Sequence, residues 1–251
     1  MSPIRQALVL LIVGIVTAIV VAPVLYPSLL DAIWHRTNNS TARTYTLDQR
    51  LDEIGPAATK RLQIRFSEAG VAYPPRDVRI VAFKAEKRLE LYARDGEGGW
   101  KLVKAFPVLA ASGVAGPKLR EGDSQVPEGI YRVSYLNPNS RYRVSLRLDY
   151  PNAEDVKRAA KDKRSNLGGD IMIHGGAASI GCLAMGDPVA EELFVLAATV
   201  GIDKVTVIVA PTDIRGKTPA VPAGAPAWTA DLYRDIGKAL AELPTVAGGQ
   251  G

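Results

Sequence analysis

The middle of the chain alternates apolar and polar residues in short runs, which is the pattern of half-buried β-strands. Strict alternation is clearest over 88–92 and 100–106, with the turn-like stretch Asp95-Gly-Glu-Gly-Gly99 between them. Further runs of strand character are 78–83, 129–135, 142–148 and 204–210. Because the runs are short and several are joined by hairpin turns, they predict a mainly β, mostly antiparallel domain with flanking helices.

Helical periodicity marks the two ends of this region. Residues 47–54 and 57–69 predict two helices, because Gly55-Pro56 interrupts the pattern and proline suits the first turn of a helix. Residues 188–200 and 228–243 carry apolar side chains spaced by three or four positions, so each predicts a helix with one buried face.

The N-terminal segment is apolar enough to enter a membrane. No charged side chain occurs between Arg5 and Asp31. The apolar run over 7–26 has the length of about 20 residues that spans a hydrocarbon core about 30 Å thick. It is either an uncleaved anchor or a signal peptide cut after Ala22, and Pro23, which follows directly, favours the anchor. Both alternatives place the rest of the chain outside the cytoplasm.

These patterns divide the chain into four parts. They are an anchor or signal sequence (1–30), a linker with short helices (31–76), a mainly β domain (77–215), and a Pro/Gly-rich linker with an amphipathic helix (216–251).

Composition narrows the function classes. The chain has 251 residues, and its net charge of +5 suits anionic partners. The basic residues are scattered and aromatic residues make up 6% of the chain, so no nucleic-acid-binding surface is predicted. One cysteine and two histidines cannot form an internal disulfide or a Cys/His zinc cluster. No metal or cofactor is therefore expected.

The single cysteine follows one of the two histidines in a glycine-bearing loop. His174 ends an apolar run, two glycines follow, and Ser179-Ile-Gly181 leads to Cys182. A free thiol with a pKa of about 8.5 is only a few per cent thiolate at neutral pH. A nearby imidazole can take its proton or stabilise the thiolate, so we expect Cys182 to be alkylated faster than a free thiol. The competing interpretation is a buried structural thiol and a core histidine. A lone cysteine in an exported protein favours the reactive thiol.

These residues resemble a known family. His174-Gly175 followed by Ser179-x-Gly181-Cys182 is similar to the signature of L,D-transpeptidase (YkuD-like) catalytic domains. The upstream segment with Gly116-Pro-Lys118, Gly122-Asp123 and Pro127-Glu-Gly129 is similar to the segment ahead of the site in that family. Tyr150-Pro-Asn152 resembles the murein L,D-transpeptidase branch of YafK-like proteins. The resemblance covers about 78–211.

The resemblance implies an L,D-transpeptidase-type fold, sandwich- or barrel-like, that acts on peptidoglycan stem peptides without a cofactor. By position, Cys182 is the nucleophile that forms a thioester with the peptide, and His174 is the general base. The backbone carbonyl of Gly175 orients the imidazole, and backbone N–H groups around Gly181 form the oxyanion hole.

The remaining predicted roles concern the substrate. Ser179 shapes the loop, and the predicted substrate-binding residues are Ser179, Lys118, Tyr150 and Asn152. The chain departs from the common pattern at Ile180, where many members have histidine, and at Leu183-Ala-Met185, where many have asparagine or arginine. The His-to-Cys loop is also shorter. These departures affect the acceptor more than the nucleophile.

Three functions remain open on the sequence. The first is an L,D-transpeptidase, and the second is a carboxypeptidase or amidase that hydrolyses stem-peptide or lipoprotein–murein links. The third is a non-catalytic murein-binding protein. The predicted partners are stem peptides, the membrane and a murein-linked lipoprotein, with the domain in the periplasm, anchored to the inner membrane or released after signal cleavage.

Overall fold

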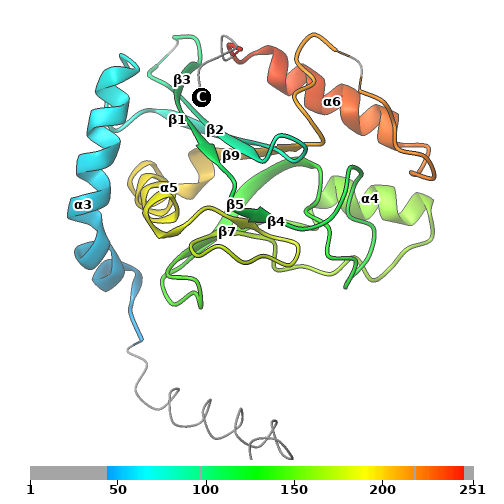
Figure 1. Ribbon diagram of the computed structural model, residues 1–251, viewed down its shortest axis with the longest axis horizontal. Helices are drawn as coiled ribbons and strands as arrows, with labels where there is room; N and C mark the ends of the chain where they lie inside the picture. The colour runs from blue at the N-terminus through cyan, green and yellow to red at the C-terminus, as the bar shows by residue number, and fades with distance from the viewer. Residues whose placement is uncertain (1–43, 97, 218, 246–251) are drawn as a thin grey trace, which may run out of the picture. The chain divides into compact units, whose positions relative to one another are not determined.

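The computed structural model describes residues 44–96, 98–217 and 219–245 (Figure 1). The described residues from Tyr45 onward form one compact unit. The helices are α3 (Leu47–Glu68), α4 (Ala153–Lys161), α5 (Asp187–Val200) and α6 (Thr229–Ala241), with a 3-10 turn at Ile202–Lys204. The strands are β1 (Asp77–Phe83), β2 (Arg88–Arg94), β3 (Lys101–Pro107), β4 (Ala110–Ala111), β5 (Gly129–Asn137), β6 (Ser145–Leu148), β7 (Met172–His174), β8 (Leu183–Ala184) and β9 (Val205–Ala210).

The predicted membrane segment, 7–26, lies outside the described residues. Within the described ranges, none of the helices has the length and apolar character needed to cross a bilayer.

All nine described strands belong to one sheet in the order β3-β2-β1-β9-β5-β6-β7-β8-β4. Six of the eight pairings are antiparallel, and only β1 with β9 and β7 with β8 run parallel. The two end strands of the sheet, β3 and β4, are consecutive in the chain and are joined through Val108 and Leu109. Val108 N–H donates to Lys87 O, next to β2, at 2.7 Å, and Leu109 N–H donates to Ala184 O of β8 at 2.9 Å. The sheet is therefore a half-barrel, which confirms the mainly β fold and replaces the sandwich alternative.

The first helix of the described residues corrects a sequence-based prediction. Residues 47–68 form the single helix α3, which runs through Pro56, where the sequence predicted a break between two helices. Its buried residues follow a spacing of four: Arg50, Ile54, Ala58, Leu62 and Phe66. This stripe packs in the same core as α5. The burial of a continuous apolar face outweighs the lost hydrogen bond and the steric cost of one internal proline.

An ion-pair clamp fixes α3 to α5. The carboxylate of Glu192, only 1% exposed, accepts from Arg61 Nε and from Arg65 Nε, each at 2.7 Å. Two guanidinium groups compensate the desolvation of one buried carboxylate, so this pairing holds the helices in one register.

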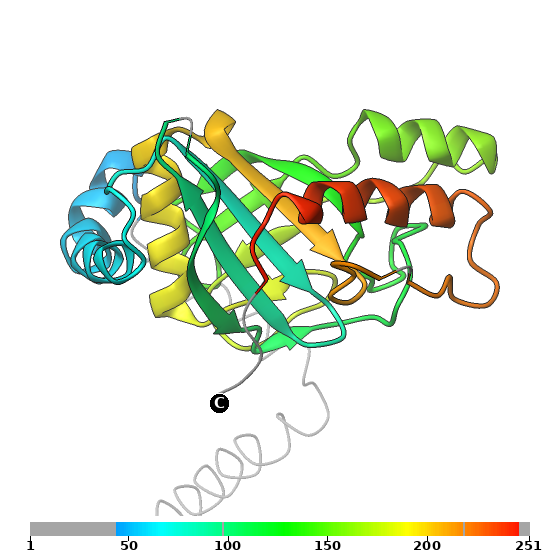
Figure 2. The same ribbon diagram turned by 90° about the horizontal axis from the view of Figure 1, so that it is seen from above.

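The C-terminal helix α6 covers strands β1, β2 and β9 on the side of the sheet opposite to α3 and α5 (Figure 2). Leu232, Ile236 and Leu240 of α6 pack in one cluster with Val81 and Ile208 of the sheet. The amphipathic helix predicted for 228–243 therefore exists, and its apolar face is buried against the sheet.

Candidate active site

Two short parallel strands bring His174 and Cys182 to one face of the sheet. His174 is the last residue of β7, and Cys182 stands directly before β8. The register pairs His174 with Ala184. Side chains alternate along a strand, so Cys182, two positions before Ala184, lies on the same face as Ala184 and His174.

The imidazole of His174 is held in one tautomer. Its Nδ1 lies 2.6 Å from the carbonyl oxygen of Gly175. Because a carbonyl oxygen only accepts hydrogen bonds, Nδ1 carries the proton and Nε2 is left as the basic nitrogen. The ring of Tyr142 stacks on the imidazole, with centroids 4.6 Å apart and an interplanar angle of 23°. His174 is 3% exposed. Burial lowers its pKa, and the bond to Gly175 opposes that effect.

The glycine after the histidine sits where no side chain fits. A Cβ on Gly175 would lie 2.3 Å from Asp187 Oδ1 and 2.7 Å from the carbonyl oxygen of Tyr142. The backbone N–H of Gly175 donates to that same carbonyl at 3.1 Å. Gly176 N–H donates to Asp187 Oδ1 at 2.8 Å. The first residue of α5 therefore fixes the loop that carries the histidine.

The backbone of Cys182 is held by Ser179. The Ser179 hydroxyl accepts from Cys182 N–H at 3.0 Å and donates to Cys182 O at 2.6 Å. This short cycle closes the loop immediately before the thiol, which is consistent with the loop-shaping role predicted for Ser179.

The surroundings of the Cys182 thiol favour its protonated form. Cys182 Sγ donates to the backbone oxygen of Asp170 at 3.6 Å, and within the described ranges it makes no hydrogen bond to His174. Burial raises the pKa of the thiol, and the hydrogen bond from Met172 N–H only partly offsets this. This direction is opposite to the activated thiolate expected from the sequence. With a neutral imidazole and a neutral thiol, the site favours proton transfer during attack over a preformed ion pair.

The backbone N–H groups predicted to form the oxyanion hole are already bonded. Gly181 N–H donates to Ser112 Oγ at 2.6 Å, and the Ser112 hydroxyl donates to Ser124 O at 2.7 Å. Cys182 N–H is bonded to Ser179, as described above. Either donor would have to exchange its serine partner for the oxyanion, so the role predicted for Gly181 stays a prediction.

Lys118 is paired within its own loop. Its ammonium group donates to Asp123 Oδ1 at 2.5 Å and to Arg120 O at 2.9 Å. Its positive charge also lies close enough to lower the pKa of Cys182 slightly. The buried pair of Lys84 with Glu128, 3.0 Å apart, anchors the end of this loop.

Tyr150 and Asn152 have structural partners. The buried Tyr150 hydroxyl donates to Leu167 O at 3.1 Å. The Asn152 side chain caps α4 by accepting from Glu154 N–H and Asp155 N–H. These bonds explain both residues without substrate, and their role in substrate binding stays a prediction.

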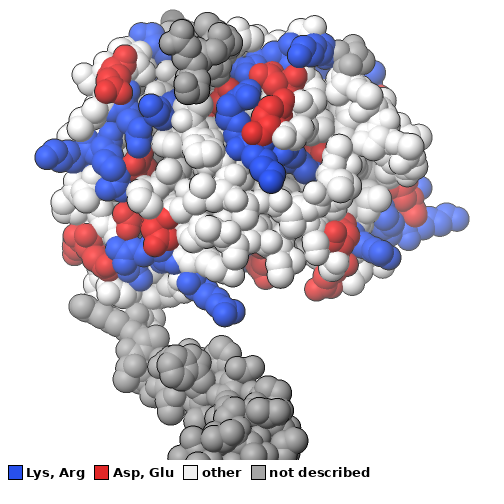
Figure 3. Space-filling model, viewed as in Figure 1, with Lys and Arg blue, Asp and Glu red and all other residues white. Residues whose placement is uncertain are grey.

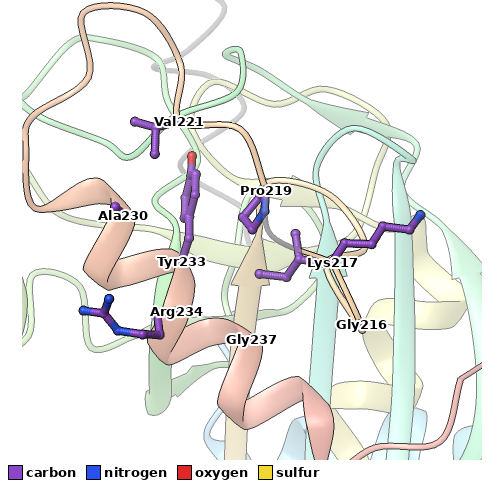
Figure 4. A pocket seen from close by; sticks show the side chains of 9 residues that line it. Gly216, Lys217, Pro219, Val221, Ala230, Tyr233, Arg234 and Gly237 are labelled. Atoms are coloured by element: carbon purple, nitrogen blue, oxygen red, sulfur yellow. The ribbon is translucent and has the colours of Figure 1, made fainter.

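The cavities and charges elsewhere do not centre on the thiol. A cavity of about 520 Å³ lies between α6 and the segment before it, and its lining includes neither His174 nor Cys182 (Figure 4). On the face shown in Figure 3, basic and acidic side chains are interspersed around a broad uncharged area. Among the described residues, no group of three or more His, Cys, Asp or Glu side chains is placed to hold a metal ion.

The sequence comparisons agree on one family. Residues 77–209 match the family model of the L,D-transpeptidase catalytic domain, YkuD. Over 119 residues, 47% of this chain, the sequence is 39% identical to an Escherichia coli K12 protein named "Putative L,D-transpeptidase YafK". The match covers 46% of that protein, so the chain spans about half the length of the curated relative. The same identity and coverage hold for the namesake in E. coli O157:H7.

Two of the solved structures that match part of the chain come from bacterial proteins. The helical cell shape determining protein Pgp2 from Campylobacter jejuni is 24% identical, with a TM-score of 0.44, over 60% of this chain and 55% of that chain. Mycobacterium tuberculosis L,D-transpeptidase 1 is 15% identical, with a TM-score of 0.30, over 53% of this chain and 61% of that chain.

Proposed function

Because this chain belongs to the L,D-transpeptidase catalytic domain (YkuD) family, we propose that it is a cysteine-dependent acyl-transferase acting on peptidoglycan stem peptides. The observation that carries the proposal is the placement of His174 and Cys182 on one face of two adjacent parallel strands, with the imidazole tautomer fixed by Gly175 O. That arrangement supplies a nucleophile and an oriented base, the two groups that acyl transfer needs.

In the proposed reaction, Cys182 Sγ attacks the carbonyl carbon that joins the stem peptide to its terminal D-residue. His174 Nε2 takes the thiol proton as the carbon–sulfur bond forms. The resulting imidazolium then gives that proton to the departing amine, and a thioester remains on Cys182. An amine of a second stem peptide then attacks the thioester, which gives a cross-linked product and frees the Cys182 thiol. If water attacks instead, the product is a hydrolysed stem peptide.

The surroundings of the pair support this order of events. The thiol stays protonated until it meets the imidazole, because burial raises its pKa. The imidazole stays unprotonated at neutral pH, because burial lowers its pKa. A neutral pair in a partly buried site resists oxidation, which suits an exported enzyme with one thiol.

We further propose that 7–26 anchors the protein to the membrane with the described domain in the periplasm. The uncharged run between Arg5 and Asp31 supports this location. The substrate is an insoluble polymer on that side of the membrane, so an anchor would keep the enzyme beside it.

The function is tested by incubating the full chain with purified peptidoglycan and analysing the muropeptides by mass spectrometry. New cross-links between stem peptides support transfer, whereas trimmed stems or released lipoprotein support hydrolysis. Intact-mass measurement of the protein should show a thioester adduct on Cys182. A Cys182→Ala variant that changes the muropeptides as wild type does would overturn the proposal in favour of a non-catalytic or unrelated role.

A further inference from the structure

A row of side chains crosses four neighbouring strands and ends at the nucleophile. The register pairs Tyr135 of β5 with Arg147 of β6, and Arg147 with Met172 of β7. Ile173 pairs with Leu183 in the parallel β7–β8 ladder, which puts Met172 beside Cys182. Paired residues share one face of a sheet, so all four side chains project to the same side.

This face is the solvent side of the half-barrel. The neighbouring residues Leu146 and Leu148 are fully buried in the core, whereas the Arg147 side chain is 46% exposed and Tyr135 is 52% exposed. The row is therefore an accessible track that leads from solvent to the thiol. Two strand spacings, about 10 Å, separate the β6 and β8 backbones, a distance that the long side chain of arginine can largely span.

Arg147 already binds a carboxylate next to the thiol. Its Nη2 lies 3.2 Å from Asp170 Oδ1. The backbone oxygen of the same Asp170 lies 3.6 Å from Cys182 Sγ. The guanidinium of Arg147 therefore reaches the carboxylate of a residue whose own backbone oxygen lies next to the reacting sulfur.

That ion pair is easily exchanged. The Asp170 side chain is 75% exposed, and exposed ion pairs contribute little to stability. A guanidinium binds an incoming carboxylate by the same paired hydrogen bonds. Other arginines close to the site are more firmly occupied. Arg143, for example, is bonded to both Glu53 and Glu191.

We infer that Arg147 is the specificity residue that binds a carboxylate of the acyl-donor peptide, which displaces Asp170 as the peptide lies along the row toward Cys182. The inference rests on the proposed function, because it identifies which group of a stem peptide the site selects. The carboxylate is the one at the end of the side chain of the residue whose carbonyl carbon Cys182 attacks. That carboxylate and the reacting carbon belong to one residue, just as the Asp170 carboxylate and the Asp170 backbone oxygen beside Sγ do.

The test measures peptide binding by calorimetry to the full chain carrying Cys182→Ala, so that no turnover occurs. The first probe is a stem tetrapeptide in which the residue under attack is diaminopimelate, an amino acid with a carboxylate at the end of its side chain. The second probe is the same peptide with that side-chain carboxylate amidated. Amidation is expected to weaken binding about 10- to 100-fold, the range for a charge-assisted hydrogen bond. Adding Arg147→Ala should weaken binding of the carboxylate peptide by a similar factor and leave the amidated peptide unaffected. Arg147→Lys should restore part of the discrimination.

The matched control is Arg94→Ala. Arg94 forms a surface ion pair with Asp77 at 2.8 Å at the far end of β2, so its loss should leave the discrimination intact. If Arg147→Ala weakens binding of both peptides equally, or keeps the discrimination, Arg147 has only a structural role and the inference is wrong. If neither peptide binds, the inference is also wrong. The proposed function is judged separately, by the thioester adduct on wild-type Cys182.

Discussion

The hydroxyl of Ser112 accepts the backbone N–H of Gly181 at 2.6 Å and so joins the end of β4 to the residue before the nucleophile. The same hydroxyl donates to Ser124 O. One serine thus connects the cysteine loop to the loop that precedes β5. This contact makes the position of the thiol depend on a segment far away in the sequence.

Replacing Ser112 with alanine should loosen the cysteine loop. We expect a loss of about 1 kcal/mol in the free energy of unfolding, the usual net value of a hydrogen bond. We expect kcat/KM for acyl transfer to fall about tenfold, because misplacing a nucleophile is costly. Thermal unfolding and steady-state kinetics measure the two effects, and Ser112→Thr, which keeps the hydroxyl, should retain most activity. A rise in activity would instead mean that the serine competes with the oxyanion for Gly181 N–H.

The thiol should react slowly with alkylating agents near neutral pH. Burial raises the pKa of Cys182, so its thiolate fraction is smaller than that of a free thiol with a pKa of about 8.5. The rate of iodoacetamide labelling, followed by intact mass, should start below that of a model peptide and keep rising in alkaline solution. A rate that is already at its plateau near neutral pH would show a preformed thiolate–imidazolium pair.

The tyrosine stacked on the histidine should control the acid limb of the pH–rate profile. Tyr142 shields His174 from water, and burial lowers the pKa of the imidazole. In Tyr142→Ala the imidazole regains hydration, so its pKa rises and the unprotonated base is lost at a higher pH as the solution is acidified. The acid limb of kcat/KM should therefore move upward in pH. Tyr142→Phe keeps the stacked ring and should leave the limb in place, whereas identical limbs in wild type and Tyr142→Ala would contradict the shielding role.

A methyl group at Gly175 should damage the site. The new Cβ would meet Asp187 Oδ1 and the backbone oxygen of Tyr142, and only the first belongs to a side chain. Overpacking of this kind costs about 1 to 3 kcal/mol, and the shift needed to relieve it would move His174. We expect Gly175→Ala to lose most activity and to unfold at a lower temperature. Gly169→Ala is the matched control, because a Cβ there has no atom within 4 Å, and equal effects of both variants would show that the clash is not the cause.

The strands and the later helices were predictable because each carries its apolar spacing over its own length. The expected half-burial of 88–92 was wrong, however, because the inner residues of β2 are buried on both faces of the sheet. Alternation over 88–92 located β2 within Arg88–Arg94, and the apolar spacing in 228–243 located α6 at Thr229–Ala241. The continuity of α3 was not predictable. The local signal of Gly55-Pro56 favours a break, and the opposing contribution is packing in the core shared with α5, which no local pattern contains.

The site divides in the same way. His174, Ser179 and Cys182 stand within one short stretch, so their spacing alone suggested their association. Ser112 is 69 positions from Gly181, and Tyr142 reaches His174 from a turn on another part of the sheet, so neither has a local signal. The direction in which the pKa of Cys182 is shifted could not be predicted from the sequence either, because it depends on how far the folded chain buries the thiol.

The family match ends at 77 and 209, yet the helices α3 and α6 on either side of that stretch complete the two hydrophobic clusters of the unit. A protein trimmed to the matching stretch would present Val81 and Ile208 to water on one side and lose the partners of α5 on the other. The stretch that matches the family and the stretch needed to complete the hydrophobic clusters therefore have different boundaries. His174 and Cys182 lie within the matching stretch, whereas the apolar faces of its sheet and of α5 are covered by two helices that lie outside it.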